Sequence, residues 1–364
     1  MKKILCAVLI AITSLFLPVS AFADTQNVTS LQFNDIESMV NAYNQDVRAN
    51  NSTNTDYSSI NSSITNLTNL KAAIDADVGT MQAKLSGLSG NELDIYTKII
   101  SLYNIYSGQI QGQIGSLQGQ LNNSWSTYLR SSTANYAIIN STQQLFILYS
   151  TLQLQKEELS IKADQVNTQL NVAKLQKDLG MLSESAFEDL SVQAQETDEA
   201  IKALNENMDG VKSQINLMLG QSFDSPITIG ALPIVDDSTL AKMNYNTDLE
   251  TGRIQNFDIR LLSYTDLYKI DDQTRKYKFT FDQKYKAVFN SKKTLKNETA
   301  KLSKEEEKLN AAQLKYDAGL ISKVDIQRQS YSFRSQLIKV KAAQKDLLQA
   351  YTSYQWLLRG YETR

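Results

Sequence analysis

Apolar residues recur at intervals of seven on both sides of a short glycine-containing stretch near the C-terminal end. The leading set is Leu295, Leu302, Leu309 and Tyr316, and the following set is Ile326, Phe333, Val340, Leu347 and Tyr354. A seven-residue apolar repeat is typical of helices that pack along one another as coiled coils. Gly319 suits the end of the first helix, because glycine adopts the left-handed conformation cheaply. Ser322 and Asp325 form a capping pattern for the next helix. The stretch therefore predicts the tip of a long helical hairpin.

A second copy of this pattern lies 139 positions earlier in the chain. The two predicted tips are Gly180, Met181, Leu182 and Ser183, and Gly319, Leu320, Ile321 and Ser322. The helix after the first tip has its own apolar seam, formed by Phe187, Leu190, Ala194, Thr197, Ile201, Leu204, Met208, Val211, Ile215 and Met218. Each copy also has an upstream box, Asn44–Arg48 in the first and Asn256–Arg260 in the second. Features that recur in the same order predict an internal two-copy repeat.

The remaining elements are less regular. Four further helices are predicted, at 31–48, 70–85, 92–121 and 136–178. Residues 50–69 are rich in Asn, Ser and Thr, whose side chains compete with helical hydrogen bonding, so their structure is the least determined. Pro226 and Pro233 mark residues 221–246 as an extended connector. Residues 257–317 contain neither Gly nor Pro, and they fit either one very long helix or two helices that reverse near Asp271 and Asp272.

The helix predicted at 92–121 carries glycine at positions 108, 112, 115 and 119, on one face. Each interior glycine costs about 1 kcal/mol relative to alanine. Such a stripe is favourable only where a second helix backbone approaches closely, as small residues permit. The sequence leaves two interpretations open: a close helix–helix contact, or a weak and frayed helix.

The repeated tips resemble a known family. The pattern Tyr-x-x-Gly-Leu-x-Ser-x-x-Asp-Ile around Gly319, together with a long preceding helix and the N-x-D-[VI]-R box, is similar to the outer membrane efflux protein (TolC) family. The resemblance extends over residues 31–360 and is strongest over 280–360. It implies a homotrimer that forms a helical duct across the cell envelope. It further implies that the tips contact a periplasmic adaptor (membrane fusion protein), which joins the duct to an inner-membrane transporter.

Asp325 has two interpretations. By the resemblance, it matches an aspartate six residues after the tip glycine that contributes to an acidic ring at the duct entrance. By local chemistry, it caps its own helix as the third residue of a capping box. The first repeat has Ala186 at the equivalent position. The tyrosines of the last helix, Tyr331, Tyr351 and Tyr354, are expected to be packing residues.

The chain departs from the family where the resemblance implies a β-barrel. Each repeat should insert strands of about ten alternating residues, but two helices fill the interval between Asn256 and Gly319. The first repeat is 73 residues longer in this interval, and the extra residues predict a helical hairpin at about 55–122. We therefore expect an all-α chain of long antiparallel coiled-coil hairpins in two TolC-like repeats, without barrel strands. Without barrel strands, we do not expect the chain to associate with the membrane through a barrel.

The predicted organisation begins with a signal peptide. Two lysines, an apolar run and an Ala-Phe-Ala site make residues 1–23 typical of an export signal. The first repeat is expected at 24–220, the connector at 221–246 and the second repeat at 247–364. Export indicates a location in the outer membrane or periplasm, or on the extracytoplasmic surface of a cell that has no outer membrane.

Composition narrows the chemistry. The chain has no histidine, so an imidazole base and histidine metal ligands are excluded. Its single cysteine, Cys6, lies in the predicted signal peptide. With 37 basic and 39 acidic residues, the chain has no excess of positive charge for nucleic acid. We expect no catalytic residues, metal or cofactor.

Two functions remain open at this stage. The first is a passive duct component of an envelope efflux or type I secretion system. The second is a barrel-less, exported coiled-coil scaffold or binding protein at the cell surface. The sequence identifies neither the substrate nor the transporter.

Overall fold

The computed structural model describes residues 28–87, 89, 91–262 and 265–363. The predicted signal peptide lies outside the described residues. The fold is all-α, as expected, with long helices and one two-stranded sheet. In chain order the elements are β1 (Ser30–Leu31), η1 (Phe33–Asp35), α1 (Ile36–Tyr43), α2 (Gln45–Lys84), η2 (Leu85–Gly87), α3 (Asn91–Asp178), α4 (Glu184–Met218), β2 (Thr228–Ile229), α5 (Asp237–Leu240), α6 (Tyr245–Gln255), α7 (Phe257–Arg260), α8 (Leu267–Asp317) and α9 (Lys323–Leu358). Among the described residues, no helix combines the length and apolar character that crossing a bilayer requires.

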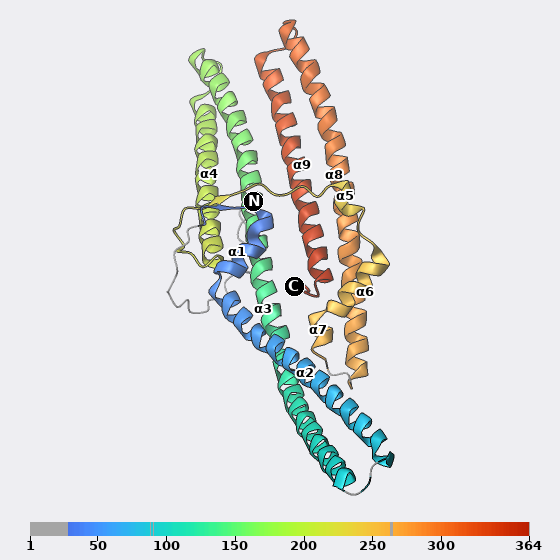
Figure 1. The fold of residues 1–364 in the computed structure, drawn as a ribbon. Helices are drawn as coiled ribbons and strands as arrows, with labels where there is room; N and C mark the ends of the chain where they lie inside the picture. Colours follow the sequence, from blue (N-terminus) through green and yellow to red (C-terminus); the bar gives the residue numbers. More distant parts are fainter. Residues whose placement is uncertain (1–27, 88, 90, 263–264, 364) are drawn as a thin grey trace.

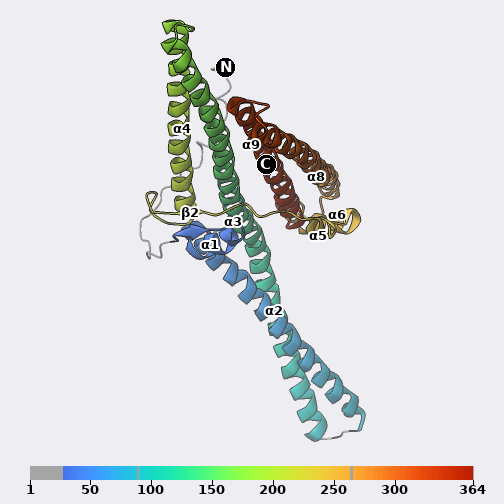
Figure 2. The same ribbon diagram turned by 90° about the horizontal axis from the view of Figure 1, so that it is seen from above.

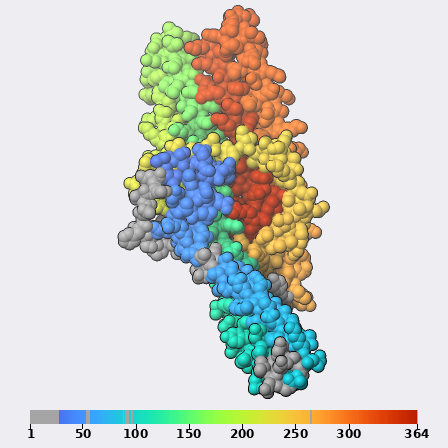
Figure 3. All heavy atoms as spheres, viewed as in Figure 1, coloured from blue at the N-terminus to red at the C-terminus, as the bar shows by residue number. Residues whose placement is uncertain are grey.

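Three helical hairpins build the molecule. Helices α3 and α4 form the first tip hairpin, and α8 and α9 form the second. The two lie side by side with their tips at the same end, and α9 packs on α3 (Figures 1 and 2). Helix α2 pairs with the first part of α3, and this extra hairpin projects in the opposite direction (Figure 1). The connector after α4 runs across the body to α5, as the space-filling view also shows (Figure 3).

Each repeat has its own apolar core. The first core joins α1, α3 and α4 with the two strands, and it also takes in Trp356 from α9. The second core joins α6, α8 and α9 around Tyr277, Phe281 and Tyr354. The predicted seam of α4 contributes to the first core through Met208. The predicted seam of α9 likewise contributes to the second core, through Leu347 and Tyr354.

Helix α3 is one helix of 88 residues, whereas the sequence predicts two helices, at 92–121 and 136–178. The intervening Asn, Ser and Thr residues do not break it. Thr133 donates its hydroxyl hydrogen to the carbonyl of Leu129 at 2.8 Å. Asn135 donates to the side chain of Asn51 at 2.9 Å and accepts from Asn50 at 2.8 Å. Polar side chains satisfied in this way leave the helical backbone ladder intact.

The Ser- and Thr-rich stretch at 50–69 is helical for the same reason. Hydroxyl groups of Ser63, Thr65 and Thr68 donate to carbonyls one turn earlier, at 2.9, 3.1 and 2.8 Å. At the base of the extra hairpin the ring of Tyr57 lies against those of Trp125 and Tyr128. These contacts add aromatic burial to a segment with little apolar surface.

The glycine face of α3 is not a close helix–helix contact within this chain. A Cβ atom added at Gly108, Gly112, Gly115 or Gly119 would meet nothing within 4 Å. Between these glycines the buried residues are Ile110 and Ile114, which lie on a different face. The helix nevertheless continues through the glycines, so the frayed-helix interpretation is not what the structure shows either.

The N-terminal segment differs from the single helix predicted at 31–48. Leu31 belongs to β1, which pairs in parallel with β2 in the register Ser30 with Thr228 and Leu31 with Ile229. Helix α1 then ends at Tyr43, because Asn44 takes an extended ψ of 123° and starts α2 as its N-cap. The strand pairing joins the start of the described chain to the connector, a long-range contact that no local pattern reveals.

The second repeat resolves the alternatives left open for residues 257–317. The connector is extended through β2, but α5 and the start of α6 lie within its predicted range of 221–246. Helix α7 ends at Arg260 and α8 begins at Leu267, so the break lies before the predicted point at Asp271 and Asp272. Asp266 sets the start of α8 by accepting a hydrogen bond from the backbone N–H of Lys269 at 3.3 Å. Two helices, α7 and α8, therefore replace the single long helix.

The upstream boxes have a shared structural role. Asn44 caps α2, and its amide also donates to the carbonyl of Met218 at 2.9 Å, at the end of α4. In the second repeat Asn256 caps α7, and the backbone N–H of Phe257 donates to the carbonyl of Gly360 at 3.0 Å. Each box thus holds the end of the last helix in its own repeat. This contact explains why the boxes and the glycine ends recur together.

Candidate functional site

Both tips reverse through the same backbone turn. Gly180 and Gly319 have φ values of 71° and 69°, as the sequence predicts. The N–H of Gly180 donates to Lys177 O at 2.9 Å, and that of Met181 donates to Gln176 O at 2.7 Å. The second tip repeats these two bonds at 2.9 and 2.8 Å. This pair of bonds is the Schellman motif, which satisfies the last carbonyls of a helix and requires a residue in the left-handed region.

Serine caps the helix that follows each tip. Ser183 Oγ accepts from the N–H of Ala186 at 3.3 Å, and Ser322 Oγ accepts from that of Asp325 at 3.2 Å. Only the second tip completes the capping box, in which Asp325 Oδ2 accepts from the Ser322 N–H at 3.1 Å and from its hydroxyl at 2.7 Å. The hydrogen bonds from the Ser322 side chain and backbone hold the pKa of Asp325 below its ordinary value. The capping role predicted for Asp325 is confirmed.

We expect Asp325→Asn to lower the melting temperature, because the amide accepts the two Ser322 bonds without a full negative charge. The pKa of Asp325 is lowered in the folded chain, so its contribution is present above the ordinary carboxyl pKa of about 3.9 and is lost as the pH falls through the lowered value. The stability difference between wild type and variant should therefore persist at neutral pH and vanish in acid. Thermal unfolding followed by circular dichroism, from about pH 2 to pH 7, measures this stability difference.

Asp317→Asn is the matched control, because Asp317 ends α8 and caps no helix. Its removal should be neutral or slightly stabilising, since a negative charge is unfavourable at a helix C-terminus. The same variants test the acidic-ring hypothesis for Asp325. An acidic ring would bind cations, and bound cations would protect the protein against thermal unfolding. If Asp325→Asn lowers stability but added cations raise the melting temperature of variant and wild type equally, Asp325 only caps its helix.

Exposed apolar side chains occupy equivalent places on both tips. Leu175 and Leu314 are 65% and 72% exposed, and Met181 and Leu320 are 73% and 75% exposed. Leu179 adds a further apolar side chain to the first tip. We call these five residues the tip surface. The neighbouring Leu182 and Ile321 are half-buried. Large apolar residues held at an exposed apex by ordered turns are typical of a surface that contacts another molecule.

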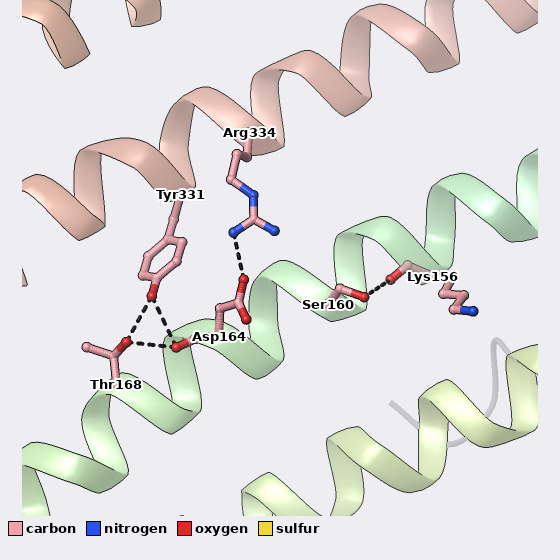
Figure 4. Close-up of polar contacts among 6 residues, drawn as sticks. All are labelled: Lys156, Ser160, Asp164, Thr168, Tyr331 and Arg334. Carbon is pink, nitrogen blue, oxygen red and sulfur yellow. Dashed lines mark hydrogen bonds and ion pairs between the residues drawn. The ribbon is translucent and has the colours of Figure 1, made fainter.

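A polar contact joins the two tip hairpins below the tips (Figure 4). Arg334 Nη1 of α9 lies 2.6 Å from Asp164 Oδ2 of α3. The Tyr331 hydroxyl donates to the Asp164 carbonyl at 3.1 Å and lies 2.9 Å from the Thr168 hydroxyl. We call these four residues the inter-hairpin contact. Tyr331 is therefore more than the packing residue that the sequence predicts, whereas Tyr354 is fully buried in the second core.

A second ion pair joins the hairpins farther from the tips, with Lys341 Nζ 2.7 Å from Glu157 Oε2. All four charged side chains in the two ion pairs are 41–50% exposed. Such pairs contribute about 0.2–1 kcal/mol each. They therefore set the alignment of the hairpins more than they stabilise it.

Sequence reasoning missed the inter-hairpin contact, although a signal for it exists. Asp164 lies 16 positions before Gly180, and Arg334 lies 15 positions after Gly319. Glu157 and Lys341 are likewise 23 and 22 positions from the same glycines. Opposite charges at matched distances from two tips indicate helices that lie in register. The two tips are therefore at the same level.

The described residues contain no group of three or more Cys, Asp or Glu side chains placed to hold a metal ion. The site consists instead of the tip surface and the inter-hairpin contact beneath it. It combines exposed apolar side chains on ordered turns with a polar connection between the two tip hairpins.

No known protein family matches the sequence, and no curated protein is significantly similar to it. Among solved structures, the chain aligns with CusC, whose crystal structures are described as showing conformational changes that accompany folding and transmembrane channel formation. The alignment has a TM-score of 0.43 at 13% sequence identity, and it covers 93% of this chain and 98% of that chain.

Proposed function

We propose that this protein is a passive, TolC-like duct component of an envelope efflux or type I secretion system. Copies of the chain form the wall of the duct, and three copies per duct follow from the family resemblance. The tip surface binds a periplasmic adaptor, which connects the duct to an inner-membrane transporter. The protein itself catalyses no step, and the transporter supplies the energy for movement of the substrate.

One observation carries this proposal. Two hairpins from different repeats lie in register and present equivalent apolar residues at the same end, Leu175 and Met181 on one tip and Leu314 and Leu320 on the other. A buried apolar core surrounded by polar residues is the usual anatomy of a protein–protein interface. Two equivalent tips per chain suit a partner that itself offers repeated helical hairpins around a ring.

The extra hairpin favours a second candidate function. Helices α2 and α3 extend the molecule away from the tips, and this extension offers a long surface to another protein. The alternative is therefore a coiled-coil scaffold or binding protein on the outer face of the membrane. The two candidates differ in whether loss of the gene impairs transport.

The test is deletion of the gene in the source organism, followed by complementation. The proposal predicts that cells without the gene retain amphiphilic fluorescent dyes or fail to release secreted proteins, and that the wild-type gene restores transport. Met181→Asp combined with Leu320→Asp should not restore transport, because burying an unpaired charge at each apex in an apolar interface costs free energy. We expect adaptor binding about tenfold weaker or worse for this variant, as for other central interface residues.

The control is Ile234→Asp combined with Ile254→Asp, which changes one exposed apolar residue in the connector and one in α6. Both double variants should unfold at the same temperature as wild type. If the tip variant restores transport as fully as the control, the tips do not bind an adaptor. If deletion affects neither dye retention nor secretion, the scaffold function is favoured instead.

A further inference from the structure

A cleft lies where the two repeats and the connector meet. Its walls come from η1 and α3 of the first repeat, from residues 233–235 of the connector and from the C-terminal part of α9. In Figure 3 this part of α9 (red) is visible between the N-terminal helices (blue) and the connector (yellow). The cleft has a volume of about 320 Å³, within the range of about 300–1,000 Å³ that is usual for small-molecule sites.

The walls of the cleft are mainly apolar. Phe33, Leu348 and Trp356 line it, and all three side chains are buried. Val235 of the connector adds a half-buried aliphatic side chain, and Tyr351 adds another aromatic ring. Such walls are typical of pockets that bind small organic molecules, and aromatic side chains pack favourably against aromatic ligands. The walls therefore suit a ligand with a flat, apolar body.

The cleft carries no uncompensated charge. Arg359 is the one charged side chain among the described residues that line it. Both terminal nitrogens of its guanidinium group pair with the carboxylate of Glu37, and Nη1 lies 2.7 Å from Oε2. The guanidinium group also lies over the rings of Tyr136 and Trp356, 4.6 and 4.5 Å from their centroids. An ionised ligand would lose its water here without gaining a free counter-charge, so a neutral ligand is favoured.

One polar group on the cleft wall is buried without a partner. Thr352 lines the cleft and is only 7% exposed, and its hydroxyl has no hydrogen-bond partner among the described residues. Other threonines of the long helices donate to the carbonyl four positions earlier, as Thr142 and Thr151 do at 2.9 Å. A buried hydroxyl without a partner costs free energy and is uncommon in folded proteins. A ligand in the cleft would supply the missing hydrogen bond.

Two glutamines on the cleft wall add further hydrogen-bonding groups. Gln143 accepts a hydrogen bond from Nε1 of Trp356 at 2.8 Å, which orients the amide and leaves its nitrogen able to donate. Gln355 lies three positions after Thr352, and its amide is able both to donate and to accept. The cleft thus offers donors and acceptors without a free charge. This set fits a small molecule with an amine, amide or carbonyl group.

We propose that the cleft binds a small, neutral aromatic molecule that carries a hydrogen-bonding group. The apolar walls hold the aromatic body, and Thr352 and the two glutamines bond to the polar group. Because the walls come from both repeats, a bound molecule contacts both and stabilises the folded chain by mass action. This inference concerns the cleft alone, and it stands whether or not the tips bind an adaptor.

A matched pair of fluorescent probes tests the class of ligand. Phenylnaphthylamine is a neutral aromatic amine, and anilinonaphthalenesulfonate is the same amine with a sulfonate group added. The neutral probe should bind as one molecule per chain and raise the melting temperature. The sulfonate should bind at least about tenfold more weakly, because its charge has no free partner in the cleft.

Tryptophan fluorescence locates the bound probe. The chain has two tryptophans, so Trp125→Phe leaves Trp356 of the cleft as the single reporter. Energy transfer falls steeply with distance, and a probe in the cleft should therefore quench Trp356 as it binds. A probe that binds elsewhere, for example on the exposed tip surface, should leave this fluorescence much less affected.

Three variants in this background test the residues. Thr352→Val removes the hydroxyl at nearly constant size, so the neutral probe should bind about fivefold more weakly, by the value of one hydrogen bond. The melting temperature of the ligand-free variant should not fall, because no hydrogen bond is lost. Gln355→Phe places a ring in the cleft and should weaken binding at least about tenfold. The control is Gln349→Phe, an exposed position of α9 outside the cleft, which should bind the probe normally.

Four results would overturn the proposal. The first is a neutral probe that shows no saturable binding or does not quench Trp356. The second is equal affinity for the neutral and the sulfonated probe. The third is a Gln355→Phe variant that binds as well as the Gln349→Phe control. The fourth is a Thr352→Val variant that loses stability while its affinity for the probe is unchanged, since the hydroxyl would then serve only the fold.

Discussion

Gly360→Ala is expected to destabilise the protein by about 2–5 kcal/mol. Gly360 has a φ of 85°, where an alanine costs about 1–2 kcal/mol. An added Cβ would also lie 1.9 Å from the carbonyl oxygen of Gln255 and 3.0 Å from the nitrogen of Asn256. Because these are backbone atoms, the second-repeat box must move away from the end of α9, and such overpacking costs about 1–3 kcal/mol more. Urea unfolding at about 25 °C measures the loss of stability.

Gly319→Ala is the matched control. Gly319 has a similar φ of 69°, but an added Cβ would meet nothing within 4 Å. Its replacement should therefore cost only the backbone strain, about 1–2 kcal/mol. Gly220→Ala should resemble Gly360→Ala, since its Cβ would lie 2.5 Å from the Tyr43 carbonyl oxygen. Equal losses at Gly319 and Gly360 would show that the boxes do not hold the helix ends.

Asn44→Ala should be the next most damaging change, at about 2–3 kcal/mol. It removes an N-cap, worth about 1 kcal/mol, and leaves the part-buried carbonyl of Met218 without the amide that now donates to it. Asn256 makes the same cap in the second repeat, but its amide nitrogen has no hydrogen-bond partner among the described residues. Asn256→Ala should therefore cost about 1 kcal/mol less than Asn44→Ala.

Asn44→Asp separates the two roles of this side chain. The carboxylate keeps the cap to Val47 but cannot donate to Met218, so its cost should exceed that of Asn256→Asp. The free energies of unfolding of all four variants show whether the hydrogen bond from Asn44 to Met218 contributes to stability. If the Asn44 and Asn256 variants lose equal stability, the bond to Met218 contributes nothing.

The tips and the repeat could be predicted from the sequence because their chemistry is local. A left-handed residue at Gly180 and Gly319 and the capping box of Ser322 with Asp325 are decided within a few positions. The seven-residue seams predict the hairpins for the same reason, since the spacing of apolar residues along one helix shows which face of that helix will be buried. Local propensity misled only where side chains satisfied the backbone in an unexpected way. The Ser and Thr hydroxyls of α2, for example, donate to carbonyls of their own helix.

The contacts between distant segments could not be predicted in this way. The pairing of β1 with β2 and the ion pair of Asp164 with Arg334 join positions far apart in the chain. No periodic pattern specifies such partners, although matched distances from the tips would have indicated the ion pair.

The central claim is that copies of this chain surround a duct with their tips at one end. Electron microscopy of the purified assembly at low salt, viewed along the helical hairpins, tests it most directly. The account predicts a ring of helical hairpins around an open centre, with the extra hairpins projecting from the end opposite the tips. A compact bundle without a central opening, or isolated single chains, would contradict it.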